Sequence, residues 1–127
     1  MTKTVIHSDN APKAIGPYSQ AIRAGNLIYT SGQIPLDPKT GAIVAGDFKA
    51  QAKQVFENLK AVCAAAGTDF SKVVKVNVFI SDMNNFAVFN DMMASYFSAP
   101  YPARSAVEVS RLPKDAMVEV ELVLVVD

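Results

Sequence analysis

The sequence predicts a single α+β domain in which a mixed β-sheet carries two α-helices on one face. Three observations predict this class. Two segments repeat apolar residues with a helical period, most of the others are rich in strand-forming residues, and the order is strands, helix, strand, helix, strand, strand. Half of the 127 residues are hydrophobic and no linker or repeat divides them, so one domain over residues 1–127 is expected.

Two segments are predicted to be amphipathic helices. Residues 48–66 carry apolar side chains at steps of three and four, with Asp47 placed to cap the start and Gly67 to end the helix. The second helix is predicted from about residue 85 to 97, and Pro100 follows it. The residues that share the apolar face of this second helix are Phe86, Phe89, Met93, Tyr96 and Phe97.

Strands are predicted where β-branched and aromatic residues are concentrated. Residues 36–44 lie between such segments and carry Asp, Pro, Lys and Gly in turn-forming order, so they are predicted to form a hairpin loop. The predicted strand segments are residues 4–7, 19–24, 27–34, 73–81, 105–109 and 117–126.

The last of these strand segments has two unlike faces, because successive side chains of a strand point to opposite sides. One face is apolar and suits packing under the helices: Val118, Val120, Leu122, Leu124 and Val126. The other face mixes two carboxylates with apolar side chains: Met117, Glu119, Glu121, Val123 and Val125. No predicted helix is left to cover this second face, so we expect another subunit to cover it.

The composition argues against several classes of function. Lys plus Arg and Asp plus Glu each number 12, so the formal net charge is zero and neither nucleic acid nor a membrane is an expected partner. With one cysteine and one histidine, no Cys/His metal cluster can form in one chain, and no glycine-rich phosphate loop is present. The sequence shows neither a transmembrane run nor a signal peptide, so a cytoplasmic protein without cofactor is expected.

Three segments carry the residues that suggest chemistry: IGPYSQA at 15–21, TSGQIPLDP at 30–38 and PARSAVEVSRLPKDA at 102–116. In this order and spacing, together with VEVE at 118–121, they resemble the signature of the RidA/YjgF family. The resemblance covers nearly the whole chain. It implies a fold like that of the Bacillus type of chorismate mutase, and a homotrimer with clefts between neighbouring subunits.

The resemblance also implies an activity. Members of the deaminase branch hydrolyse 2-imino acids, or enamine tautomers such as 2-aminoacrylate, to 2-keto acids and ammonia. The chain is therefore expected to be a 2-iminobutanoate/2-iminopropanoate deaminase that acts in metabolite damage control without a cofactor or metal.

Arg104, Glu119 and Tyr18 are the expected catalytic residues. The planar fork of Arg104 can hold a substrate carboxylate through two parallel hydrogen bonds, although an arginine here also suits the surface or a pair with Glu108. Glu119 can orient water and move protons, a role that Glu121 fits equally well by residue type. Tyr18 follows Gly-Pro, a context in which a tyrosine is commonly a packing anchor. The resemblance favours the catalytic role for all three residues.

Five more residues are expected to bind substrate. Ser31 offers a hydroxyl, and Gly32 allows a ligand to approach the backbone closely. Asn90 and Phe89 lie on the second predicted helix, where the alternatives are a helix surface and a helix core. At position 106 the family motif usually has cysteine, whereas this chain has Ala106, which leaves only backbone groups for binding and excludes covalent cysteine catalysis there.

Two further functions stay open from the residues. A trimeric protein that binds small carboxylates without turnover is compatible with Ala106. RNA cleavage, an attribute of some relatives, is disfavoured because the chain is neutral and has no basic stripe. The preferred imino acid and the pathway that supplies it do not follow from the sequence.

Overall fold

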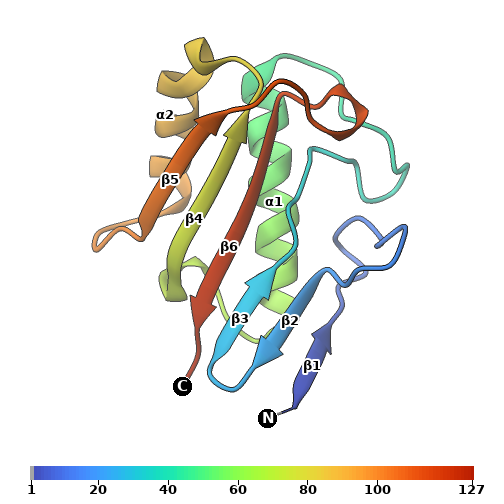
Figure 1. Ribbon diagram of the computed structural model, residues 1–127, viewed down its shortest axis with the longest axis vertical. Helices are drawn as coiled ribbons and strands as arrows, with labels where there is room; N and C mark the ends of the chain where they lie inside the picture. The colour runs from blue at the N-terminus through green and yellow to red at the C-terminus, as the bar shows by residue number, and fades with distance from the viewer. Residues whose placement is uncertain (1) are drawn as a thin grey trace.

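The computed structural model describes residues 2–127, which form one six-stranded sheet with the order β1-β2-β3-β6-β4-β5. All neighbouring strands are antiparallel except β4 and β5, which are parallel. Figure 1 shows β6, the last strand of the chain, lying between β3 and β4. The strands are β1 (Lys3–Ile6), β2 (Ala21–Ala24), β3 (Leu27–Thr30), β4 (Val73–Ile80), β5 (Ala103–Glu108) and β6 (Val118–Val125).

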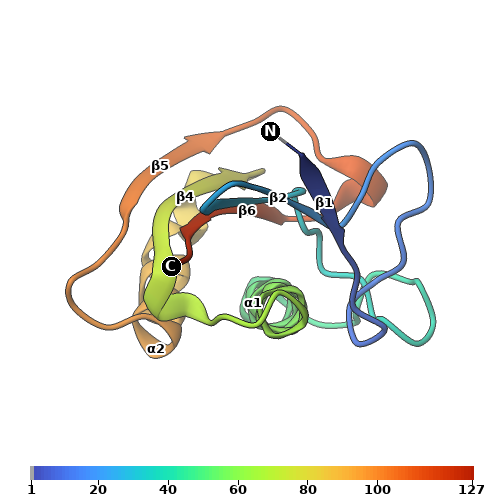
Figure 2. The same ribbon diagram turned by 90° about the horizontal axis from the view of Figure 1, so that it is seen from below.

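Both predicted helices are present, α1 (Phe48–Ala65) and α2 (Phe86–Tyr96), and they lie on the same side of the sheet (Figure 2). The Asp47 side chain caps α1 by accepting a 3.0 Å hydrogen bond from the Ala50 N–H. Gly67, with φ +77°, follows the helix as expected. The α+β fold class is therefore confirmed. Within residues 2–127, no helix combines the length and apolarity that a membrane span requires.

The strand predictions hold to within two residues at every end except one. The strand expected to reach residue 34 ends at Thr30, and only Gln33 makes a further bridge, to Val120. Pro35 has no N–H to donate to a ladder, so the chain turns away from β6 after this bridge. The predicted loop over residues 36–44 is a hairpin closed by a bridge between Leu36 and Ile43.

The two faces of β6 differ as the alternation predicts. Its residues Val118, Val120, Leu122 and Leu124 are buried under the helices. Its residues Glu119, Glu121, Val123 and Val125 are only partly buried and lie on the open face of the sheet, the face opposite α1 and α2 (Figure 2). Register pairing places Tyr29, Leu27, Phe79 and Asn77 on the same open face.

Buried Gln20 anchors the segment that precedes β2. Its side-chain carbonyl accepts a 2.6 Å hydrogen bond from the Ser8 N–H, and its amide donates to the carbonyls of Ser8 and Pro12 at 3.1 and 2.8 Å. All three residues are buried, so these bonds replace water that cannot reach the backbone. Gln20 therefore fixes the path of the loop that leads from β1 to β2.

Gln20→Leu is expected to lower the free energy of unfolding by about 3 kcal/mol, because buried backbone groups of Ser8 and Pro12 lose their partners. Urea unfolding followed by circular dichroism measures this change. Lys53→Ala, at an exposed position of α1, is the control and is expected to shift stability by no more than about 0.5 kcal/mol. Equal stabilities of the two variants would contradict the role given to Gln20.

Candidate active site

The expected site residues fall into two separate groups in one chain. Arg104 and Asn90 line a cavity of about 390 Å³, the arginine pocket, which is formed by Asn90, Met93, Ala94, Tyr101, Pro102 and Arg104. Tyr18, Ser31, Gly32 and Glu119 line a second cavity of about 490 Å³, the glutamate pocket. The glutamate pocket is completed by Pro12, Lys13, Ile15, Gln33, Ile34, Leu36, Pro113 and Lys114.

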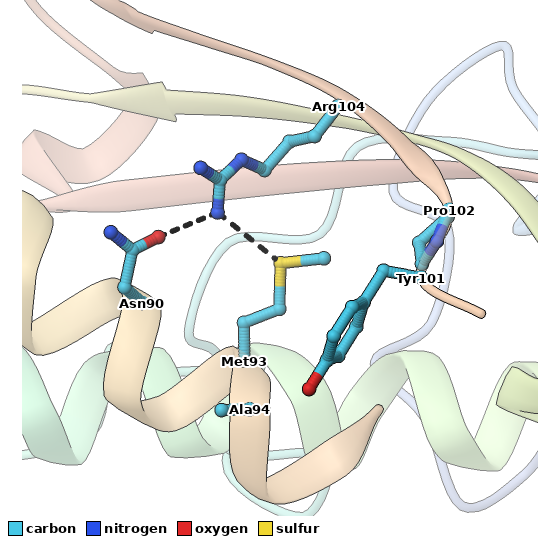
Figure 3. Close-up of a pocket in the computed structure, with 6 residues that line it drawn as sticks. All are labelled: Asn90, Met93, Ala94, Tyr101, Pro102 and Arg104. Atoms are coloured by element: carbon cyan, nitrogen blue, oxygen red, sulfur yellow. Dashed lines mark hydrogen bonds between the residues drawn. The ribbon is translucent and has the colours of Figure 1, made fainter. Parts of the chain in front are cut away.

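Arg104 reaches from β5 to α2, as Figure 3 shows. Its Nη1 donates a 2.6 Å hydrogen bond to Asn90 Oδ1 and lies 3.7 Å from the Met93 sulfur. The guanidinium carbon also lies 5.0 Å from the centre of the Phe86 ring, within the range of a cation–π contact. Three neutral groups of α2 therefore contact the charged end of Arg104.

Arg104 forms no salt bridge within residues 2–127, so the alternative pairing with Glu108 does not occur. The Glu108 carboxylate instead accepts a 2.9 Å hydrogen bond from the Met83 N–H, in the 3₁₀ turn before α2. The guanidinium has five N–H donors and the contacts to Asn90 and Met93 use only one of its nitrogens. Its other donors are available to an anion in the arginine pocket.

Glu119 lies against Gly32 in the glutamate pocket. A Cβ added to Gly32 would overlap the carboxylate and come within 2.8 Å of Glu119 Cδ, so only glycine leaves room for this position of the side chain. The backbone pairing of Gln33 with Val120 holds the loop beside β6 at this point. Glycine at position 32 thus allows the loop to cover one side of the carboxylate.

Burial raises the pKa of Glu119 above its ordinary value, and the like charge of Glu121 on the same face raises it further. Both effects disfavour the ionised form. A carboxyl group with a raised pKa exchanges protons closer to neutral pH than an ordinary glutamate does. Glu119 is therefore suited to proton transfer, and it lines the glutamate pocket, whereas Glu121 does not.

Tyr18 and Ser31 occupy the rim of the same pocket. The Tyr18 side chain is about half exposed, at 51%, and its hydroxyl accepts a 3.4 Å hydrogen bond from the Ile15 N–H. The Ser31 hydroxyl donates to the Ser19 carbonyl at 2.6 Å, which leaves its oxygen free only as an acceptor. Tyr18 is thus open to a ligand, whereas the Ser31 proton is already engaged.

The sheet separates the two pockets. Arg104 pairs with buried Val76, so it lies on the helix face of the sheet, whereas Glu119 pairs with Phe79 on the open face. Their strands, β5 and β6, are also separated by β4. A small molecule bound to Arg104 cannot contact Glu119 of the same chain.

Two expected substrate-binding residues line neither pocket. Phe89 is fully buried, packs against Phe56 with ring centres 5.5 Å apart, and belongs to the core, so a single chain does not expose its ring to a ligand. The aromatic ring that contacts Arg104 is Phe86, three residues earlier. Ala106 lies on the same face of β5 as Arg104 and packs against the core.

Several residues that line the pockets or contact Arg104 were not anticipated. Met93 and Phe86 were assigned to the apolar face of the second helix, but their spacing with Asn90 at four and three residues also places all three on one side of a helix. Lys114 follows Pro113 and borders the glutamate pocket with φ +56°, in the left-handed region. No sequence pattern indicates that Lys114 adopts this conformation.

Within residues 2–127, no three His, Cys, Asp or Glu side chains gather in a way that suits a metal ion. Burial raises the pKa of the Cys63 thiol to about 12, and the charge of Asp69 adds to this. A thiol with such a pKa stays protonated and unreactive at neutral pH. The ionisable groups that line the two pockets are the Arg104 guanidinium, the Glu119 carboxyl, the phenols of Tyr18 and Tyr101, and the ammonium groups of Lys13 and Lys114.

Comparison with known proteins identifies the family. The family model described as endoribonuclease L-PSP, also known as the YjgF/RidA family, matches residues 8–126. This chain belongs to the RidA/YjgF family. The resemblance drawn from the three motifs is therefore confirmed.

Relatives of the RidA/YjgF family match along nearly their whole length. A RutC family protein of Pyrococcus horikoshii is 58% identical over 95% of this chain and 96% of its own. The 2-iminobutanoate/2-iminopropanoate deaminase of Salmonella typhimurium is 51% identical over 98% of both chains. A Rid family crystal structure from Yersinia pestis is 50% identical, with a TM-score of 0.96 over 98% of this chain and 100% of that one.

Gly32→Ala is expected to lower the pKa of Glu119 toward that of an ordinary glutamate, because the new methyl group must push the carboxylate out of its sheltered position. The Gly32 backbone is not in the left-handed region, so alanine itself causes no backbone strain. Carbon-13 NMR titration of labelled glutamate measures the pKa. Glu121→Gln, which removes the like charge, serves as a positive control, and an unchanged pKa in Gly32→Ala would contradict the contact.

Proposed function

We propose that this protein hydrolyses short 2-imino acids to 2-keto acids and ammonia in the cytoplasm, with 2-aminoacrylate, 2-iminopropanoate and 2-iminobutanoate as substrates. The observation that carries the proposal is Arg104, a guanidinium that has no acidic partner among residues 2–127 and borders a cavity in a chain of this family. The deaminase name of the Salmonella typhimurium relative supports the same activity. The activity would remove reactive imines and enamines.

In the proposed reaction Arg104 holds the substrate carboxylate and Glu119 acts on water. The carboxylate of Glu119 takes a proton as the water oxygen bonds to C2 of the protonated imine, and it returns that proton to the nitrogen. The C2–N bond then breaks with its electron pair staying on the departing ammonia, while the C2 hydroxyl gives its proton to Glu119 and the C2 oxygen becomes the keto group. Glu119 passes this proton to the ammonia, which leaves as ammonium. No group of the protein is modified and no electrons are exchanged with another reagent.

Ala106 is compatible with this reaction. The steps need a carboxylate clamp, a water molecule and one group that moves protons, and none of them needs a thiol. The backbone N–H and C=O of Ala106 are the only groups it can offer to a ligand. We therefore propose the same substrate class as for family members with cysteine at this position. The two kinds of site can differ in the substrate side chains that they accept.

We further propose that each complete site forms between two subunits of a homotrimer. Arg104 and Glu119 of one chain lie on opposite faces of the sheet, so both can act on one small substrate only if they come from different copies. The open face offers the apolar surface for such an interface. Tyr29 and Val5 on this face are 49% and 62% exposed, and Val123 and Val125 are partly buried beside them.

A second candidate is a trimer that binds small carboxylates without turnover, which Ala106 favours because the motif lacks its usual side chain. Calorimetry with 2-ketobutanoate, combined with the assay below, separates the two functions. The description of the family model as an endoribonuclease does not lead us to propose RNA as a substrate, since the net charge is zero.

The wild-type protein, added to a pyridoxal-phosphate dehydratase and threonine, is expected to accelerate release of the 2-keto acid. Arg104→Ala and Glu119→Gln are each expected to lower kcat/KM by on the order of 100-fold, through loss of the carboxylate contact and of proton transfer. Arg23→Ala, whose side chain binds the Gly25 carbonyl, and Glu57→Gln, at an exposed position of α1, are the matched controls. No acceleration by the wild type at pH 7 to 8 would refute the deaminase activity.

Co-expression of the Arg104→Ala chain with the Glu119→Gln chain is expected to restore about a quarter of the wild-type activity, because random mixing gives that share of sites two intact residues from different copies. Each variant expressed alone stays inactive. Absence of recovery, in mixed oligomers isolated with two different affinity tags, would refute a site shared between subunits.

A further inference from the structure

One face of α2 contacts Arg104. Phe86, Asn90 and Met93 follow one another at steps of four and three residues, so they lie on one side of the helix, and each contacts the guanidinium. Asn90 and Met93 accept from the same nitrogen, Nη1. Phe86 makes a different kind of contact, because its ring centre lies 5.0 Å from the guanidinium carbon.

The Phe86 ring is not simply part of the aromatic core. Phe56, Phe70, Phe89, Tyr96 and Phe97 form a network of ring pairs with centres 4.8 to 6.3 Å apart, and Phe86 takes part in none of these pairs. Phe86 is partly exposed, whereas Phe89 in the same helix is fully buried. Phe86 packs against the edge of the core, and its position at the first residue of α2 also brings its ring to Arg104 of β5.

Two capping contacts set the position of this first residue. The Glu108 carboxylate, four residues after Arg104 on β5, accepts from the Met83 N–H at 2.9 Å, and the Asp82 side chain accepts from the Asn84 N–H at the same distance. Arg104 and Glu108 lie on one face of β5, because they pair with Val76 and Ile80. The strand that carries the arginine therefore also fixes the start of the helix that carries the ring.

We propose that Phe86 is a positioning residue that orients the Arg104 guanidinium for a substrate carboxylate. A guanidinium held against an aromatic ring retains its in-plane N–H donors, which are the ones that grip a carboxylate through two parallel hydrogen bonds. Asn90 takes one donor of Nη1 and thereby limits rotation of the fork. This role rests on the proposed function, in which Arg104 binds the carboxylate of an imino acid.

The test measures binding of two ligands by calorimetry: 2-ketobutanoate and its uncharged analogue 2-ketobutanamide. Phe86→Leu keeps an apolar side chain and removes the ring, and it is expected to weaken 2-ketobutanoate binding by about fivefold to tenfold while leaving amide binding unchanged. Phe86→Tyr keeps the ring and is expected to restore carboxylate binding. Phe70→Leu, at a partly buried phenylalanine of the aromatic network, is the matched control and is expected to change neither affinity.

Unchanged 2-ketobutanoate affinity in Phe86→Leu would overturn the proposal, and so would an equal loss for acid and amide or failure of Phe86→Tyr to restore binding. Thermal unfolding of each variant shows whether the protein remains folded under the conditions of the titration. The readout is binding, so it stays valid if the wild type hydrolyses no imine. In that case the deaminase activity fails while the positioning role of Phe86 is still decided by the two ligands.

Discussion

Neighbouring residues of a β-strand point to opposite faces of the sheet, and this constraint determines which side chains one copy of the chain can bring together. On β6 it buries Val118 and Val120 under the helices and turns Glu119, between them, to the open face. On β5 it turns Arg104 to the helix face, where α2 contacts it. The core and the separation of the arginine pocket from the glutamate pocket follow from the same alternation, so neither pocket can move to the other side without exchanging the faces of a strand.

Polar contacts fix the rims of both pockets relative to the sheet. Gln20 holds the backbone at Ser8 and Pro12, and the segment between these residues and β2 carries Tyr18 into the glutamate pocket. On the other side Glu108 holds the turn before α2, so that Asn90 lies where Arg104 can donate to it. Neither contact involves a group proposed to touch substrate. The stability of the fold and the geometry of the site therefore depend on some of the same hydrogen bonds.

The sequence was sufficient for the fold because its elements are locally well marked. Asp47 and Gly67 bound α1 as predicted, and the alternation over residues 117–126 gave both faces of β6. The sequence was less informative where tertiary packing selects among similar side chains. Phe86 and Phe89 lie on the same apolar side of α2, and nothing in their type tells which ring enters the core and which lies under a guanidinium. The motifs indicated Arg104 and Glu119, but only strand register revealed that they lie on opposite faces.

The charges of the two pockets explain why an anionic ligand suits the proposed assembly. When a neighbouring copy covers Arg104, its charge loses water, and the neutral acceptors Asn90 and Met93 do not neutralise it. Glu119 of the other copy is held against Gly32, where burial raises the pKa of its carboxyl above the ordinary value. A substrate carboxylate supplies the missing charge and leaves Glu119 free to take a proton from water. Because the two groups lie on opposite faces of the sheet, they cannot pair within one chain, and in the proposed assembly the substrate carboxylate is the anion that pairs with Arg104.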